Sequence, residues 1–226
     1  MPPTYTPIAD HALLVEFATE IGDDANAAVV SLDRAIARQT PTGVVEVVPA
    51  FVNLLVDFDP TVTDHPTVES AVRELLAHPP DTDVVPRDHV VQVCYEGAFA
   101  PDLAAVAERS QLSVEAVIDA HLAGEYRVVM YGFAPGYAYM AGVADAIQVP
   151  RKPAPIRGVA AGSVIIAGPQ CLVTTIEMPT GWSIIGRSPT RVLRPEADRP
   201  FLFDPGDRVT FERVDPDTFE RQVRAW

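Results

Sequence analysis

The sequence is poor in cysteine and in basic residues, and each shortage excludes a class of protein. Two cysteines, Cys94 and Cys171, stand among 226 residues, and neither has the CxxC or Cys/His spacing of a metal site. We expect both to be reduced thiols in the core. Lys and Arg number 17 against 31 Asp and Glu, and the formal net charge of −14 disfavours binding to nucleic acid or anionic membranes.

Long hydrophobic runs are also missing. No segment approaches the roughly 20 apolar residues of a membrane-spanning helix. The beginning, MPPTYTPIADHALLVEF, lacks the basic start and apolar centre of a signal peptide. Walker, GxSxG and HExxH motifs are absent, and the glycines of 132–142 do not fit GxGxxG. We therefore expect a cytoplasmic protein that holds no metal and has no nucleotide-binding signature.

The amino-terminal part alternates between strand-like and helix-like patterns. In chain order, the expected elements are a strand at 11–17, a helix at 23–39, strands at 44–51 and 52–59, and a helix at 67–78. Asp23 or Asp24 is expected to cap the first helix. This order predicts a small α+β sandwich, which a further strand at 89–96 would complete.

The segment 78–88 has three prolines and three acids, which is typical of a linker. We place a boundary near Pro86, giving domains 1–85 and 86–226. A helix from Asp102 to Ser110 and a second one capped by Ser113 are too acidic for a DNA-binding pair. From Tyr126 onward, short strand-like runs separated by Gly, Pro or Asp predict a closed or nearly closed barrel.

Three arginines are candidates for binding an anion. Arg151 and Arg157 belong to PRKPAPIR, whose prolines stiffen the backbone, and Arg187 lies in GRSP. A stiff backbone aims a guanidinium at low entropic cost, which suits a carboxylate or phosphate. The alternative is that each is a solvated surface charge. The uncharged loop GFAPGYAYMAG (132–142), with three aromatic rings, is a second candidate feature.

Other candidates keep two interpretations. His121 is either a helix-end histidine facing the negative end of the helix dipole or a site residue. Trp182, beside a glycine in PTGWSIIGRSP, is either core packing or a wall that faces a ligand. Ser163 lies among small residues that allow close approach to a ligand, but no base lies near it in sequence, which argues against a nucleophile.

Four ordered motifs together resemble the KipI / allophanate hydrolase subunit 1 family, whose members are also called the B subunits of 5-oxoprolinase. They are GFAPGYAYM, VPRKPAPIRGVAAGSVIIAG, PTGWSIIGRSP and PFLFDPGDRVTF. The resemblance covers nearly the whole chain. It implies an α+β protein in which a small amino-terminal α/β sandwich domain precedes a cyclophilin-like β-barrel.

The resemblance also implies partners. Family members pair with a homologous allophanate hydrolase subunit 2 (KipA-type) protein, and in bacterial 5-oxoprolinase a third, lactam-utilisation subunit joins them to open 5-oxoproline with ATP. The same unit occurs fused in urea carboxylase, where it takes a carboxyl group from carboxybiotin. One branch inhibits a sporulation histidine kinase. We expect a subunit of an ATP- or biotin-dependent enzyme acting on a small amide or lactam, inactive alone and binding no cofactor itself. Prolyl isomerisation has only fold analogy behind it.

The family motifs fall on identifiable positions of this chain. The residues that the resemblance assigns to substrate binding are His121, Tyr126, Phe133, Pro135, Gly136, Tyr139, Arg151, Ser163, Trp182 and Arg187. They are expected to line the barrel cleft or its seam with the partner, and no catalytic role is assigned among them. Ala9 and Thr180 stand where the family usually has glycine, which suits a branch acting on another amide or lactam.

Overall fold

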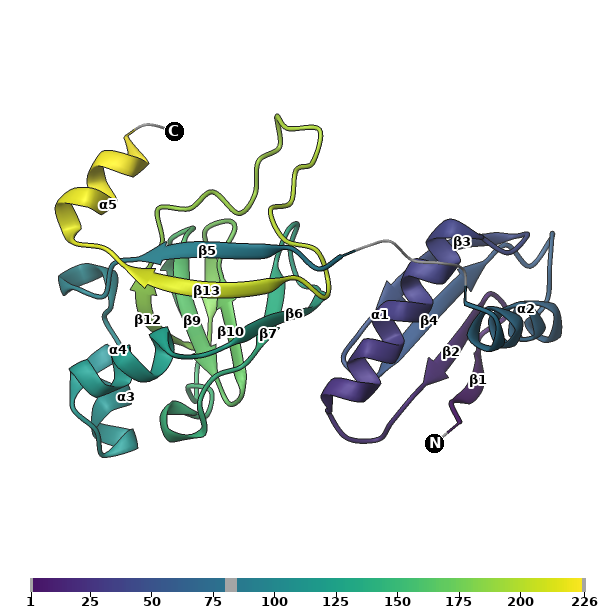
Figure 1. Ribbon diagram of the computed structural model, residues 1–226, viewed down its shortest axis with the longest axis horizontal. Coiled ribbons are helices and arrows are strands. Elements are labelled where there is room, and N and C mark those ends of the chain that lie inside the picture. The colour runs from purple at the N-terminus through teal and green to yellow at the C-terminus, as the bar shows by residue number, and fades with distance from the viewer. Residues whose placement is uncertain (1, 80–84, 225–226) are drawn as a thin grey trace. The chain divides into compact units, whose positions relative to one another are not determined.

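The computed structural model describes residues 2–79 and 85–224 (Figure 1). Its contacts divide the chain into two compact units, Met1–Val85 and Pro86–Trp226. Five residues of the expected linker, 80–84, lie outside the described residues. Among the described helices, none combines the length and the apolar character that crossing a membrane requires.

The first unit is a four-stranded antiparallel sheet with two helices packed on it. Its elements are β1 (Thr4–Ile8), β2 (Ala12–Glu16), α1 (Asp23–Arg38), β3 (Val44–Pro49), β4 (Asn53–Phe58) and α2 (His65–Ala77). The strand order is β1-β2-β4-β3. Alternate residues of the central strands, such as Val15 and Val56, are fully buried against α1 and α2. This agrees with the expected α+β sandwich.

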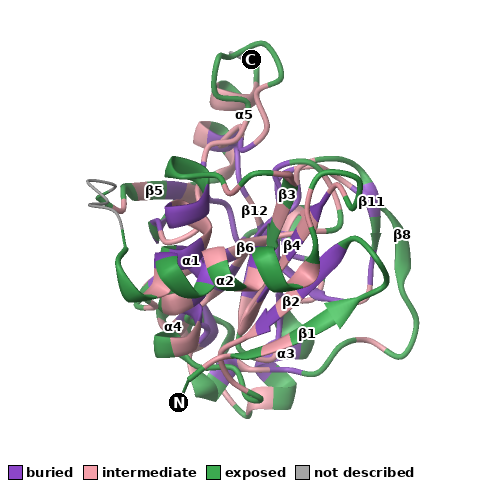
Figure 2. Cartoon of the chain, turned by 90° about the vertical axis from the view of Figure 1, so that its right-hand side faces the viewer, coloured by how far each residue is buried: buried purple, intermediate pink, exposed green. Residues whose placement is uncertain are grey.

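Three local details of this unit differ from expectation. β1 was not expected, because its sequence TYTPI contains a proline and two polar threonines. The strand is mostly exposed, as an edge strand can be (Figure 2). Neither Asp23 nor Asp24 caps α1, whose N-cap is Gly22. α2 begins two residues early because the Asp64 side chain accepts a hydrogen bond from the Thr67 N–H at 3.0 Å.

The second unit is built on a seven-stranded sheet that curls into a barrel. Its strands are β5 (Asp88–Val93), β6 (Tyr126–Tyr131), β7 (Ala138–Ala141), β9 (Ser163–Ala167), β10 (Gln170–Val173), β12 (Ser183–Arg187) and β13 (Arg208–Arg213). Its helices are η1 (Gly97–Phe99), α3 (Leu103–Ser110), α4 (Val114–Leu122), η2 (Asp145–Ile147) and α5 (Pro216–Val223). A separate pair is formed by β8 (Ile156–Val159) and β11 (Met178–Thr180).

The barrel closes between the first and last strands of the order β12-β9-β10-β7-β6-β13-β5. Cys94, just after β5, exchanges two backbone hydrogen bonds with Arg187 of β12, at 2.8 and 2.9 Å. The backbones approach closely here because residue 186 is a glycine: a Cβ there would lie 2.5 Å from Val93. These contacts confirm the expected cyclophilin-like barrel.

One strand prediction was wrong in its partner. The strand expected at 89–96 does not complete the amino-terminal sandwich. It is β5, and it pairs in parallel with β13, from Asp88 beside Arg208 to Val93 beside Arg213 (Figure 1). A parallel pairing across about half the chain leaves no local turn signal, so the sequence pattern could not identify the partner.

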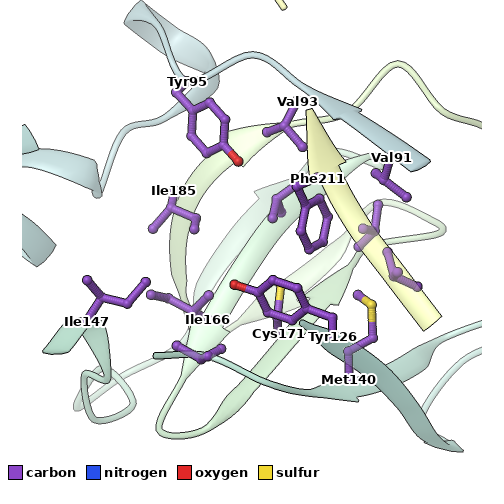
Figure 3. Close-up of a cluster of buried hydrophobic side chains, with 14 of the residues drawn as sticks. Val91, Val93, Tyr95, Tyr126, Met140, Ile147, Ile166, Cys171, Ile185 and Phe211 are labelled. Carbon is purple, nitrogen blue, oxygen red and sulfur yellow. The ribbon is translucent and has the colours of Figure 1, made fainter. Parts of the chain in front are cut away.

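Barrel side chains alternate between two apolar clusters. Val164 and Ile166 of β9 point into the barrel, whereas Ile165 and Ala167 of the same strand join a cluster on its outer surface. Figure 3 shows the interior, where Tyr95, Phe211 and Tyr126 point toward one another from different parts of the chain. The period of two therefore gives the barrel two packed faces, a core inside and a second layer outside.

Candidate functional site

A pocket of about 420 Å³ lies over the outer cluster. Three segments form it: the loop before β7, the proline-rich segment after Val149, and the turn between β11 and β12. The lining residues are Phe133, Tyr137, Tyr139, Arg151, Lys152, Pro155, Pro179, Thr180, Gly181 and Trp182. Its volume falls in the range of small-molecule sites, roughly 300–1,000 Å³.

Four aromatic rings run in a row along this pocket. The ring centroids of Phe133 and Tyr137 are 5.7 Å apart, those of Tyr137 and Tyr139 are 5.8 Å apart, and those of Tyr139 and Trp182 are 5.9 Å apart. Trp182 is 6% exposed and belongs to the outer cluster. Both interpretations of Trp182 therefore apply, because the ring packs in a core and also forms a pocket wall.

Arg151 adds a positive charge at the end of this row. Its guanidinium carbon lies 5.6 Å from the Trp182 ring, within reach of a cation–π interaction. Among the described residues, no carboxylate forms an ion pair with Arg151. Burial raises the pKa of the Tyr139 hydroxyl, and the Arg151 charge partly opposes that rise. The pocket thus presents a cation whose donors are free for a ligand.

Lys152 is held differently from Arg151. Its Nζ pairs with the Asp102 carboxylate at 2.5 Å, and the same Oδ2 accepts the Ile184 N–H at 2.7 Å. The Lys152 backbone N–H donates to the Gly181 carbonyl at 2.6 Å. Asp102 therefore fixes the proline-rich segment against β12, and the structural pairing of Lys152 leaves Arg151 as the pocket's available cation.

Local sequence explains how the walls are held. A buried Thr180 hydroxyl accepts the Trp182 N–H at 3.1 Å, so the residue that replaces the family's usual glycine fixes the turn carrying the indole. In the loop, Gly136 has φ of 68°, and a Cβ there would lie 3.0 Å from the Phe201 ring. The Pro135 carbonyl accepts the Thr175 hydroxyl at 2.9 Å.

The structure brings four of the expected site residues into this pocket: Phe133, Tyr139, Arg151 and Trp182. Pro135 and Gly136 belong to the same loop and shape it without lining the pocket. Tyr137, Lys152 and Thr180 line it but were not expected as site residues. For Tyr137 a signal existed, since its spacing of two from Tyr139 on a strand places both rings on one face.

The other expected residues lie elsewhere. His121 and Tyr126 are 0% and 1% exposed, inside the barrel. The hydroxyl of the buried Ser163 donates to the Ala160 carbonyl at 2.8 Å. Arg187 ends β12, five residues from Trp182, which at about 3.3 Å per strand residue is roughly 16 Å.

The three arginines expected to share an anion site are therefore not together. Arg187 donates to the Ala161 carbonyl at 3.3 Å, and its guanidinium carbon lies 5.7 Å from the Phe219 ring. Arg157 is exposed on β8. Of the three, only Arg151 lines the pocket. The pocket therefore does not bind an anion through two or three arginine side chains together.

Comparisons with known proteins identify the family. The model of the carboxyltransferase domain, subdomain C and D, matches residues 3–203. The chain is 39% identical over 218 residues to the 5-oxoprolinase B subunit of Bacillus subtilis (strain 168), covering 92% of this chain and 91% of the relative. It is 34% identical over 179 residues to the corresponding protein of Haemophilus influenzae, covering 78% and 84% of the two chains.

Solved structures agree with the fold. The crystal structure of TTHA0988 is 33% identical with a TM-score of 0.82, and the match covers 92% of this chain but 40% of that one. The Kluyveromyces lactis urea carboxylase, at 17% identity and a TM-score of 0.78, shares the fold over 98% of this chain and 22% of its own. The chain belongs to the carboxyltransferase-domain family, subdomain C and D, together with the 5-oxoprolinase B subunits.

Proposed function

We propose that this chain is a subunit of a heteromeric enzyme acting on a small amide or lactam, and that the aromatic pocket binds the carboxylate or carbonyl of the substrate. One observation carries the site assignment. Arg151 lies over the Trp182 ring at the end of a row of aromatic rings, without a carboxylate partner among the described residues. A planar guanidinium with free donors suits a bidentate contact with a carboxylate.

The shape and chemistry of the pocket fit a compact, flat ligand with one charge. 5-Oxoproline, the ligand implied by the names of the relatives, combines a five-membered lactam with a carboxylate. The rings of Tyr139 and Trp182 would cover the lactam face, and Arg151 would take the carboxylate. The aromatic wall lowers the local dielectric, which strengthens that charge contact relative to water.

Partners carry the rest of the reaction in this proposal. Relatives are named as subunits, and this chain matches only part of longer chains such as TTHA0988 and urea carboxylase. The pocket offers no glycine-rich phosphate loop, and its lysine is engaged by Asp102. We therefore assign ATP to a partner subunit, where it supplies the free energy for opening the amide. The proposed partners are a homologous KipA-type subunit and a third, lactam-utilisation subunit.

The test uses the complete complex. The chain is co-expressed with both proposed partner subunits, and glutamate formation from 5-oxoproline with ATP is measured for wild type, Arg151→Met and Arg157→Met. We expect Arg151→Met to lower kcat/KM about 100-fold, since a lost charged hydrogen-bonding contact is worth roughly 1.5–3 kcal/mol. Arg157→Met, an exposed arginine of the same segment outside the pocket, is the matched control and stays near wild type.

Urea and allophanate are assayed beside 5-oxoproline. Turnover of urea with carboxybiotin would move the assignment to carboxyl transfer. An intact complex that turns over none of these substrates would refute the enzyme proposal.

A second function, inhibition of a histidine kinase by docking, is favoured by one feature. Phe133 is 74% exposed at the pocket edge, and an exposed aromatic residue suits a protein contact. Adding the purified chain to a sporulation-type histidine kinase and following autophosphorylation separates the two functions. Inhibition of autophosphorylation by the wild-type chain that is lost in Phe133→Ala would support docking. An autophosphorylation rate that the wild-type chain leaves unchanged would refute the inhibitor function.

A further inference from the structure

Phe133 has an unusual backbone for a bulky residue. Its φ is 71°, in the left-handed region that side chains other than glycine rarely adopt. The Ala134 N–H donates to the Gly132 carbonyl at 2.9 Å, two residues back, which makes Phe133 the centre of a γ-turn of the strained, positive-φ kind. Strained backbone persists only where the surroundings hold it, and it gathers at ligand clamps and switches.

The rest of the loop explains how the strain is held. The Gly132 N–H donates to the Tyr137 carbonyl at 3.1 Å, and the Tyr137 N–H donates to the Ala134 carbonyl at 3.0 Å. Gly136 is buried and sits against Phe201. Both sides of the γ-turn are therefore anchored, and the unusual conformation is confined to Phe133.

The same residue also has an exposed ring. The Phe133 side chain is 74% exposed, and its ring contacts the Tyr137 ring at 5.7 Å while lining the pocket. The other three rings of the row are buried or half-buried. Backbone strain and an exposed apolar ring are both unfavourable, and the two costs fall on one residue at the pocket mouth.

We propose that Phe133 is the gate of this pocket: its ring folds onto the ring face of a bound ligand and excludes water from that face, while Arg151 at the other end of the row holds the ligand carboxylate. The inference rests on the proposed function in that the pocket binds a small carboxylate. Closure removes apolar surface from water and can relax the γ-turn, so both costs in the open state favour closing. Phe133 thereby selects carboxylates that carry a flat ring over those that do not.

The test measures binding by the fluorescence of Trp182. Trp182 and Trp226 are the chain's two tryptophans, so a Trp226→Phe background makes Trp182 the sole reporter. The probes are 5-oxoproline, benzoate and acetate. We expect Phe133→Ala to weaken binding of the two ring-bearing probes about tenfold and to leave acetate unchanged, whereas Phe133→Leu keeps most of the affinity. Ile176→Ala, exposed in the same unit but outside the pocket, is the control.

Each result decides a separate point. Equal loss for all three probes in Phe133→Ala, or no loss for any, would overturn the gate. If the chain binds benzoate and acetate but not 5-oxoproline, the assignment of a lactam substrate is wrong. The effect of Phe133→Ala on benzoate affinity would still test the gate. Unchanged affinities together with loss of co-purification with the KipA-type subunit would place the ring in a subunit interface instead.

The strain itself has an independent readout. Phe133→Gly should raise the melting temperature of the chain by about 2–4 °C relative to Phe133→Ala, because glycine accepts positive φ without a steric cost. Equal melting temperatures for Phe133→Gly and Phe133→Ala would show that the backbone at position 133 is not strained, and the γ-turn would then not support the proposal.

Discussion

The two faces of the barrel wall use similar side chains for opposite purposes. Inside, the Tyr95 hydroxyl lies 2.7 Å from His121 Nδ1, and the Cys171 thiol lies 3.6 Å from Nε2 of the same ring. The Tyr126 hydroxyl donates to the His121 carbonyl at 3.1 Å. Outside, the row of rings ends at Arg151, which has no carboxylate partner among the described residues.

This difference separates a structural network from a binding site. The interior polar atoms satisfy one another, as buried polar groups must, and have no capacity left for a ligand. The outer pocket keeps an available cation, and one of its rings is exposed on strained backbone. Family motifs supply residues to both faces, so membership of a motif does not by itself mark a ligand contact.

The largest predicted effect comes from the interior histidine. His121→Leu fills the space but leaves the buried Tyr95 hydroxyl without its partner, which should lower the free energy of unfolding by about 3 kcal/mol. Urea denaturation of the purified chain measures the loss. Affinity for the probe carboxylates should stay at the wild-type value, since His121 does not line the pocket.

The double variant Tyr95→Phe/His121→Leu is the control for this prediction. Removing both polar partners should restore most of the lost stability, because the unsatisfied hydroxyl is gone. If the losses in the free energy of unfolding add, or if either variant loses ligand affinity, the inner and outer faces do not have separate roles.

The interior face should also respond to pH. Burial lowers the pKa of His121 to about 3, from an ordinary value near 6.5. Below pH 6.5 the unfolded chain therefore binds a proton that the folded chain does not, and stability falls as pH falls toward 3. His121→Leu lacks this titration, so its deficit relative to wild type should shrink by about 2 kcal/mol between pH 7.5 and 5.0. Urea titrations at both pH values measure it, and a constant deficit would contradict a neutral buried imidazole.

Much of the fold could be predicted from local pattern. Helix periodicity marked α1, α2, α3 and α4, and the Ser113 cap on α4 is present, with its hydroxyl accepting the Ala116 N–H at 3.1 Å. The short strand-like runs after Tyr126 predicted a barrel, and the resemblance specified a cyclophilin-like one. Long-range pairing was not predictable, because the pairing of β5 with β13 leaves no local signal in the sequence. β1 was missed because it is an exposed edge strand and its proline interrupts the strand pattern.

The site was predictable in its parts and not in its grouping. Arg151, Trp182 and the aromatic loop were all recognised, but nothing in the sequence separates Arg151 from Arg187. That separation follows from the length of β12, because Trp182 directly precedes the strand and Arg187 ends it. His121 could not be placed either, because a helix-end histidine faces the barrel interior only once the helix has packed against it.

A smaller effect is expected at Asp102, the N-cap of α3, which joins the two faces because the next residue, Leu103, packs in the inner cluster. Its carboxylate holds Lys152 at the pocket and accepts the Ile184 N–H of the barrel wall. Asp102→Asn should lower unfolding stability by about 1–2 kcal/mol by weakening a charge-assisted pair of hydrogen bonds, and should weaken ligand binding a fewfold. Asp119→Asn, an exposed acid on α4, is the matched control. Urea denaturation and probe binding measure both effects, and a change in only one would assign Asp102 to one face.

The smallest expected effect is an absence of reaction at the two thiols. Cys94 and Cys171 are both 0% exposed, and burial raises the pKa of each thiol, so neither supplies thiolate in the folded chain. Titration with an aromatic disulfide reagent should label both only as fast as the chain unfolds, and adding the probe carboxylates should slow labelling through stabilisation of the folded state. Fast labelling of Cys171 in folded protein would mean that the barrel interior opens to solvent, and the interior network would then be a second accessible site. Cys171→Ala identifies which thiol reacts, because its loss removes that signal and leaves the signal of Cys94.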